Sequence, residues 1–240
     1  MRQVRSDVYD QSALMTEAAN ALIQQGYSIV VPFDADEFWN AEAGEFERMS
    51  QSMPEALFQG HWVNFVQSRK CHVSGRTSPL HMRYRAPAAE SADQNSIGTY
   101  SHTFVCLLER KIAFKTRGVV EIDVGQHALM RGPYRLCGPS IEIFHLPLRS
   151  REEIIKRGLN YEPRRAPLRL QPWMGWQSAF HRRAVLDEKV DEVWASSSSD
   201  DNGRVDVYGA PLALIPDTRL QHMLIGAISH LFTRYGLVPF

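Results

Sequence analysis

The sequence has no excess of charge of either sign, because 27 Lys and Arg balance 27 Asp and Glu. Proteins that bind nucleic acid through its phosphates usually carry a basic surplus, so the charge balance gives no reason to expect such a partner. No apolar run reaches the ~18 residues of a membrane span, and no hydrophobic stretch follows Met1-Arg2-Gln3-Val4-Arg5 as it would in a secretory signal. We therefore predict a cytoplasmic protein with no transmembrane segment.

Cysteine is also scarce. Cys71, Cys106 and Cys137 are odd in number and widely spaced, which favours reduced, buried thiols over a disulfide. The sequence contains no internal repeat. Its 240 residues, 44% of them apolar, suffice for one sizeable globular domain, or for one domain with a helical extension.

The first predicted element is a helix that begins near Asp10 or Ser12 and ends at Gly26, a residue suited to the position after a helix. The residues Tyr27 to Val31 then read as a buried strand. This strand leads into Asp34 and Asp36, so acids follow a strand end, a common place for an α/β active site. Two rows of apolar residues at helical spacing support the helix: Leu14, Ala18 and Leu22, and Met15, Ala19 and Ile23.

Further elements follow from short apolar runs and turn signals. Ser150 and Glu153 have capping-box spacing and predict the start of a helix. A final helix is expected after Pro216-Asp217, with its apolar face running from Leu220 to Leu231. Strands are expected at 62–66, 103–107, 112–115, 119–124 and 141–144, a long polar excursion at 68–95, an Arg- and Pro-rich connection at 163–172 and a flexible surface loop at 195–203.

The segment with most chemical content is Asp34-Ala35-Asp36-Glu37-Phe38. Two carboxylates one residue apart in a turn can reach one hard cation, such as Mn²⁺ or Mg²⁺, directly or through water. A cation held in this way neutralises a diphosphate leaving group. Taken alone, the same pattern also fits a solvated acidic turn.

A resemblance extends this reading. The run from Ile29 to Trp39 resembles the Asp-x-Asp-Glu-Phe signature of bacterial family-2-like glycosyltransferases of GT-A type. The match covers about residues 9 to 220 in order. Its other parts are Tyr9-Asp10-Gln11-Ser12 with Met15-Thr16, Gly125-Gln126-His127, the His-x-Pro-x-Arg-Ser element His145 to Ser150 followed by Lys156, and Asp217-Thr218-Arg219-Leu220.

The resemblance implies an α/β fold with a GT-A-like (Rossmann-like) mixed sheet flanked by helices. It implies a partial glycosyltransferase domain at 1–162 and a C-terminal extension of helix and loop at 163–240. Only eight residues precede Tyr9, so we expect the fold to be truncated at its N-terminus, without the family's nucleotide-binding strands. The implied reaction is metal-dependent transfer of a sugar from a nucleotide-diphosphate sugar to a hydroxyl of a carbohydrate or other acceptor.

By the same resemblance, Asp34 and Asp36 would bind Mn²⁺ or Mg²⁺. A late histidine would complete the site, His145 in the first place and His127 in the second, although a lone histidine is more often structural. Arg149 and Lys156 would contact the donor, or else form a solvated pair at a helix start.

The catalytic base stays open. Glu37, Glu121 and Asp123 are the candidates, and Glu142 also lies in a plausible neighbourhood. Trp173 and Trp176 fit packing better than sugar stacking.

Two other functions compete with transfer. One is a truncated, non-catalytic remnant that binds carbohydrate or a protein partner. The other is a metal-dependent hydrolase, which would require denser ligand clusters than this sequence has.

Overall fold

The structure is a computed structural model. It describes residues 11–42, 44–51, 53–71, 78–87, 110–123, 125–132, 134–138, 140–160, 176–207 and 210–235. The chain forms a mixed α/β structure with two compact units. The first unit is Met1–Val63 with Leu108–His145 and Glu162–Gln171, and the second is Asn64–Leu107 with Leu146–Tyr161 and Pro172–Phe240. The predicted domain boundary after residue 162 falls outside the described residues and stays a prediction.

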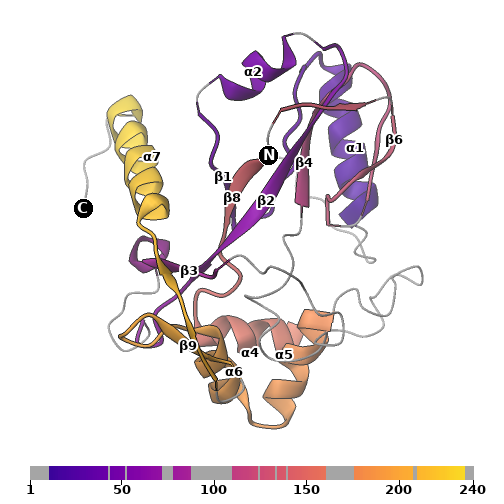
Figure 1. Cartoon of the computed structure of the whole chain (residues 1–240). Coiled ribbons are helices and arrows are strands. Elements are labelled where there is room, and N and C mark those ends of the chain that lie inside the picture. The colour runs from indigo at the N-terminus through magenta and orange to yellow at the C-terminus, as the bar shows by residue number, and fades with distance from the viewer. Residues whose placement is uncertain are drawn as a thin grey trace. The chain divides into compact units, whose positions relative to one another are not determined.

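The first unit is built on a mixed sheet around the long strand β2 (Ala56–Val66). β8 (Ile141–His145) lies beside β2, and β1 (Glu37–Trp39) pairs antiparallel with β8 (Figure 1). β4 (Arg110–Lys115) pairs antiparallel with β2, whereas β7 (Arg135–Leu136) pairs parallel with it. The sheet thus mixes both pairing directions, which confirms the coarse α/β prediction. The finer GT-A-like assignment stays a prediction.

Alternation along β2 sends neighbouring side chains to opposite faces of this sheet. Leu57 joins a core with Ile112 and Phe114 of β4, against helix α1 (Gln11–Gln24). Phe58 joins the other core, beside Ala113 and a short helix, α2 (Glu45–Ser50).

Helix α1 confirms the first predicted element. Gly26 has φ of 87°, the Gly26 N–H bonds to the Ile23 carbonyl, and the Tyr27 N–H bonds back to Leu22, so the predicted C′ glycine closes a Schellman motif.

Three polar side chains of α1, spaced four residues apart, hold the helix to the chain around β5 (Glu121–Ile122). This strand is shorter than the 119–124 expected. Ser12 donates to the Ile122 carbonyl, Thr16 accepts from the Ile122 N–H, and Asn20 bonds both backbone groups of Val120. β5 pairs with β6 (Leu129–Arg131).

The strand expected at Tyr27 to Val31 is reduced to one residue. Val30 forms an isolated antiparallel bridge with Phe114 of β4, with N···O distances of 2.8 and 2.9 Å. Tyr27 is exposed, and Val30 is the one buried residue between Tyr27 and Val31.

In its described part, the second unit combines helices with short strands. The helices α4 (Arg151–Asn160), α5 (Trp176–Leu186) and α6 (Val190–Ser197) share a core that includes Ile154, Ala184 and Trp194. Residues Phe65 and Val66 at the end of β2 pair with β3 (Tyr84–Arg85), which follows the 3-10 turn η1 (Pro79–His81). The remaining strands are β9 (Arg204–Val207) with β10 (Ala210–Ala213), and β11 (Ile215–Pro216), which pairs with β3.

Two predictions in this unit require correction. The segment 195–203 is not a flexible surface loop at its centre, because Ser198 and Ser199 are buried and Ser199 forms a bridge with Ser68. Helix α4 begins where expected, but its cap differs: the Glu153 carboxylate accepts from the Arg149 N–H at 2.8 Å, one residue before the expected Ser150.

The last helix, α7 (Arg219–Tyr235), begins after Asp217 as predicted, and Asp217 accepts the Arg219 N–H at 3.0 Å. Only the start of its expected apolar face is covered. Leu220 is buried, whereas Ile228 and Leu231 are exposed. None of the helices in the described ranges combines the length and the apolar character needed to cross a bilayer.

Candidate functional site

The acidic segment forms a turn, as predicted. The Glu37 N–H bonds to the Asp34 carbonyl at 3.1 Å, and the Asp34 N–H bonds back to the Glu37 carboxylate at 3.2 Å. This reciprocal pair closes the turn around Ala35 and Asp36. β1 begins at Glu37, so the turn is joined directly to the sheet of the first unit.

The register of the sheet then brings distant residues onto one face. Glu37 lies opposite His145 in the β1–β8 ladder, and Gly60 lies opposite Lys111 in the β2–β4 ladder. Trp62 is two residues after Gly60, so its side chain lies on the same face. The Trp62 ring stacks on the His145 ring with centroids 4.0 Å apart.

Lys111 is the centre of the cluster. Only 2% of its side chain is exposed, and its Nζ lies 2.8 Å from Asp34 Oδ2 and 3.2 Å from Glu37 Oε1. It also donates to the Gly125 carbonyl at 2.6 Å. Burial, the largest influence, would lower the Lys111 pKa, but Glu37 and Asp34 together outweigh it and the pKa is raised. Lys111 therefore stays charged.

Glu37 is enclosed. Its side chain has 0% exposure, accepts hydrogen bonds from Trp62 Nε1 at 2.9 Å and from the Asp34 N–H, and forms an ion pair with Lys111 Nζ at 3.2 Å. Desolvation raises the Glu37 pKa, and Lys111 partly offsets that rise. A general base must reach the acceptor hydroxyl, and this enclosure disfavours Glu37 for that role.

Asp34 is the open member of the cluster, with 38% of its side chain exposed. Its Oδ1 accepts long hydrogen bonds of 3.3 Å from Gln11 of α1 and Gln126. Gln126 follows β5 with a positive φ of 65°, a conformation rare for a side-chain-bearing residue. The turn that holds it is fixed by Asp123, whose Oδ1 accepts the N–H groups of His127 and Ala128.

Asp123, a candidate base, is thus engaged in shaping this turn. Glu121 is exposed on β5, and Glu142 of β8 accepts a hydrogen bond from the Asn40 side chain at 3.3 Å. The geometry does not single out either of them as the base.

The two predicted histidines flank Trp62. His127 lies edge-on to the Trp62 ring at 6.5 Å, and His145 lies stacked upon it. His127 Nδ1 is 2.7 Å from the Arg110 carbonyl, so Nδ1 carries the proton and Nε2 is the nitrogen of ligand type. A histidine oriented by a backbone carbonyl is typical of metal sites.

The predicted donor contacts lie in the second unit. Arg149 pairs with Glu153 through Nε at 2.8 Å, and Lys156 is exposed on α4. Trp173 is outside the described residues, and Trp176 is the first residue of α5. Arg149 and Lys156 stay predictions as donor ligands.

A metal ion would not find a complete protein site here. Within the described ranges, no group of three or more His, Cys, Asp or Glu side chains is arranged to hold one. Lys111 already occupies one position on Asp34 Oδ2. However, a carboxylate offers about four acceptor positions, and hydrogen bonds from Gln11, Gln126 and Lys111 use three of those on Asp34.

The formal charge of Asp34, Glu37 and Lys111 together is −1, because two carboxylates oppose one ammonium. This charge leaves the predicted Mn²⁺ or Mg²⁺ a prediction: such an ion would have to arrive with a diphosphate and take only one or two carboxylates from the protein, as Mg²⁺ commonly does.

Comparisons with protein-family models, with curated proteins and with solved structures found no match to this chain.

Sequence reasoning missed Lys111 and Trp62. Trp62 is the first residue of the strand expected at 62–66. Lys111 directly precedes the strand expected at 112–115, and a lysine in that position reads as a solvated strand end. A lysine flanked by buried strand residues would have been the signal for an internal acidic partner.

Proposed function

We propose that the chain carries the metal-binding and acceptor-side portion of a glycosyltransferase, which transfers a sugar from a nucleotide-diphosphate sugar to a hydroxyl acceptor. The observation that supports this most directly is the register of Glu37 opposite His145. This register brings the acidic turn beside His145, as the motif resemblance requires, although the two are more than 100 residues apart in the sequence.

The chain's own residues have separable roles in this proposal. Lys111 holds Asp34 and Glu37 in one arrangement, and Trp62 covers Glu37 while supporting His145. Asp34 and Asp36 would then hold Mn²⁺ or Mg²⁺ through one or two carboxylates, with the donor diphosphate completing the coordination. When bound, the cation would neutralise charge on the departing nucleoside diphosphate.

A site of this kind predicts weak binding of the metal alone and strong coupling with nucleotide. We expect Mn²⁺ to tighten binding of a nucleoside diphosphate, and the nucleotide to tighten binding of Mn²⁺ by the same factor, about 5- to 150-fold. Calorimetry with UDP, GDP, CDP and dTDP, each with and without Mn²⁺, measures this coupling. Asp36→Asn should remove the coupling, because it deletes a charge without changing size.

Asp187→Asn is the matched control, since Asp187 is paired with Arg183 at the end of α5 in the other unit. It should leave the coupling unchanged. Failure of all four nucleotides to bind in the presence of Mn²⁺ would refute the proposal.

A second candidate is a non-catalytic protein of the same design that binds carbohydrate or a protein partner. The ion pairs that Lys111 forms with Asp34 and Glu37 favour it, because carboxylates that are paired within the protein have less capacity for a ligand. Oligosaccharide binding without nucleotide binding would support this candidate over the first.

A further inference from the structure

Helix α7 (yellow in Figure 1) carries an apolar face that is open to solvent along most of its length. The helix is fixed at its start, where Leu220 is buried and the Gln221 side chain donates to the Leu80 carbonyl of η1. Beyond this start, Phe232 is the one residue from Ile225 to Tyr235 that is not exposed. The large apolar side chains on this stretch that are 39% to 62% exposed are Ile225, Ile228, Leu231 and Tyr235.

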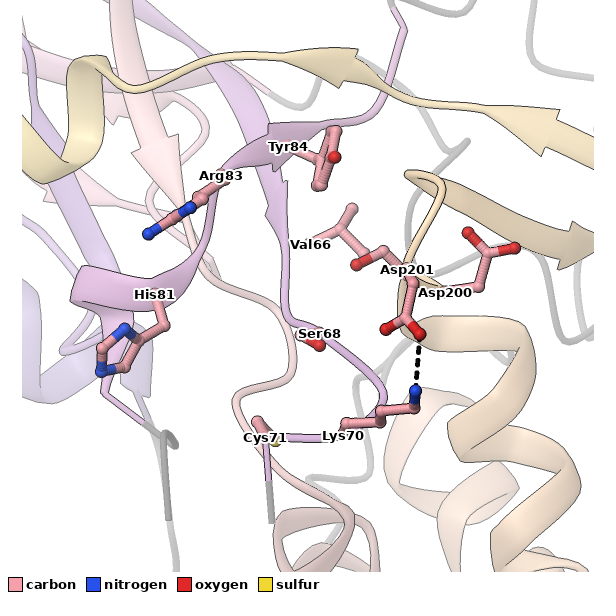
Figure 2. A pocket seen from close by; sticks show the side chains of 10 residues that line it. Val66, Ser68, Lys70, Cys71, His81, Arg83, Tyr84, Asp200 and Asp201 are labelled. Carbon is pink, nitrogen blue, oxygen red and sulfur yellow. Dashed lines mark hydrogen bonds and ion pairs between the residues drawn. The ribbon is translucent and has the colours of Figure 1, made fainter. Parts of the chain in front are cut away.

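This apolar face does not form the wall of the cavity in the same unit. That cavity, of about 370 Å³, is lined by residues of the segment from Val66 to Cys71, of the stretch from His81 to Tyr84 and of the segment 199–201 (Figure 2). None of the residues that line it belongs to α7. A small molecule in the cavity would therefore leave the exposed side chains of α7 uncovered.

The apolar face is also broad. Its members stand in two adjacent rows at helical spacing: Leu224, Ile228, Leu231 and Tyr235, with Ile225 and Phe232 beside them. At about 100° between successive residues, the apolar side chains from Ala227 round to Ile225 span about 160° of the helix. One helix packed alongside would cover only a narrow seam, as in a coiled coil. The width therefore favours an extended apolar layer over a single partner helix.

The opposite side of α7 has no carboxylate side chain, because no Asp or Glu occurs after Asp217. Arg219 at the start of the helix is paired with Asp217, and the Arg234 guanidinium at its end lies 5.7 Å from the centroid of the Tyr235 ring. Arginine and tyrosine combine an apolar body with a polar tip, which suits the boundary between lipid headgroups and hydrocarbon. The other residues on this side are two histidines and three small residues: His222, His230, Gly226, Ser229 and Thr233. With no carboxylate to repel it, the helix suits a surface that carries anionic headgroups.

We infer that α7 binds the surface of an anionic phospholipid bilayer and lies in its interface, with the apolar face among the acyl chains. Arg234 contacts the headgroups at the end of the helix. A helix that lies in the interface does not cross the bilayer, which agrees with the absence of a spanning helix in the described ranges. The exposed part of α7 is about three turns long, a length at which an isolated helix is marginal in water, so the bilayer also orders it. The inference does not rest on the proposed transferase function, since it uses no residue of the acidic turn.

The test is flotation of the full chain with small vesicles made from equal amounts of phosphatidylcholine and phosphatidylglycerol. We expect the chain to float with the vesicles. Ile228→Gln/Leu231→Gln should weaken this binding at least about tenfold, because two apolar side chains no longer enter the hydrocarbon. Glutamine keeps the helix propensity of α7. The matched control is Leu159→Gln/Leu186→Gln, which changes two exposed leucines of α4 and α5 and should float as the parent does.

Circular dichroism verifies that each variant folds and supplies a second signal. The vesicles should raise the helical content of the parent and of the control, but not that of the double variant on α7. Arg234→Gln should weaken binding by a smaller factor. The inference is overturned if the parent does not float with the vesicles, or if the folded double variant on α7 floats like the parent. It is also overturned if sedimentation shows a dimer of the parent that the α7 variant dissociates, which would assign the face to a second copy of the chain.

Discussion

A lysine with 2% exposure must be compensated, because an unpaired ammonium in that position would lose its proton or destabilise the fold. Lys111 is compensated twice, by Asp34 and by Glu37. The arrangement is asymmetric. Asp34 reaches solvent, whereas the buried carboxylate of Glu37 is held by Lys111, Trp62 and the Asp34 N–H. Removing Lys111 should therefore cost more through Glu37 than through Asp34.

We predict that Lys111→Met lowers the free energy of unfolding by about 3–5 kcal/mol at neutral pH, the typical cost of a buried charge that loses its partner. The double variant Lys111→Met/Glu37→Gln should recover part of this loss, because no buried charge then remains at position 37. Urea unfolding of both single variants and the double variant gives the coupling energy.

The surface variant Lys189→Met is the control, since Lys189 is half-exposed and its contact with Glu192 is 3.8 Å long. It should change stability by less than about 1 kcal/mol. Strictly additive losses in the double variant would show that Lys111 and Glu37 do not depend on each other.

At the scale of elements, the sequence predicted correctly those features that depend on interactions between neighbouring residues. Helix α1 ends at Gly26 because the chain needs a positive φ there, and that requirement is legible in the sequence. The strand before Asp34 was predicted too long, because only Val30 finds a partner in β4. The serines at 198 and 199 read as a loop, yet packing and the bridge to Ser68 bury them. Tertiary contacts override composition in such cases.

Helices α4 and α5 pack closely at Gly158, which is buried. A Cβ at this position would come within 2.7 Å of the His181 carbonyl oxygen and 2.9 Å of Val185 Cγ2. Because the nearest atom is backbone, a rotamer change cannot relieve the clash. We predict that Gly158→Ala destabilises the protein by about 1–3 kcal/mol, despite the better helix propensity of alanine.

Gly226 of α7 is the matched control, because it is also helical but a Cβ there would meet nothing within 4 Å. Gly226→Ala should raise stability by about 0.5–1 kcal/mol. Thermal unfolding of the two variants should thus move in opposite directions. A stabilised Gly158→Ala would mean that α4 and α5 do not pack as closely as described.

At the scale of the whole molecule, the order of motifs along the chain predicted which segments would come together at the candidate site, but not how they would be held. The acidic turn and His145 were expected to meet, and the β1–β8 register sets Glu37 opposite His145. Lys111 and Trp62 could not be found in the same way, because their roles depend on strand pairing between residues far apart in the sequence. Periodicity reports which face of a strand is buried, and it does not report which strand lies beside it.

The response of the whole molecule to acid should depend strongly on one histidine. His181 is buried at 1% exposure, and its Nδ1 has no hydrogen-bond partner within the described residues. Desolvation, with a smaller contribution from Arg157, lowers its pKa from 6.5 to about 4, and Glu153 opposes the shift only weakly. The unfolded chain therefore takes up this proton first as the pH falls.

It follows that the stability associated with a neutral His181 is complete above about pH 6.5 and declines towards pH 4, by roughly 3 kcal/mol in total. We predict that His181→Phe flattens this decline. Between pH 7 and pH 5 the parent should lose about 2 kcal/mol more than the variant, as measured by urea unfolding at both values. Other groups titrate between pH 7 and pH 5, so the informative quantity is the difference in unfolding free energy between the two proteins.

The control is His230→Phe, at an exposed histidine of α7, which should keep the parent's dependence on pH. If His181→Phe keeps it as well, the His181 side chain is reached by water, and its burial between α4 and α5 cannot be the source of acid sensitivity.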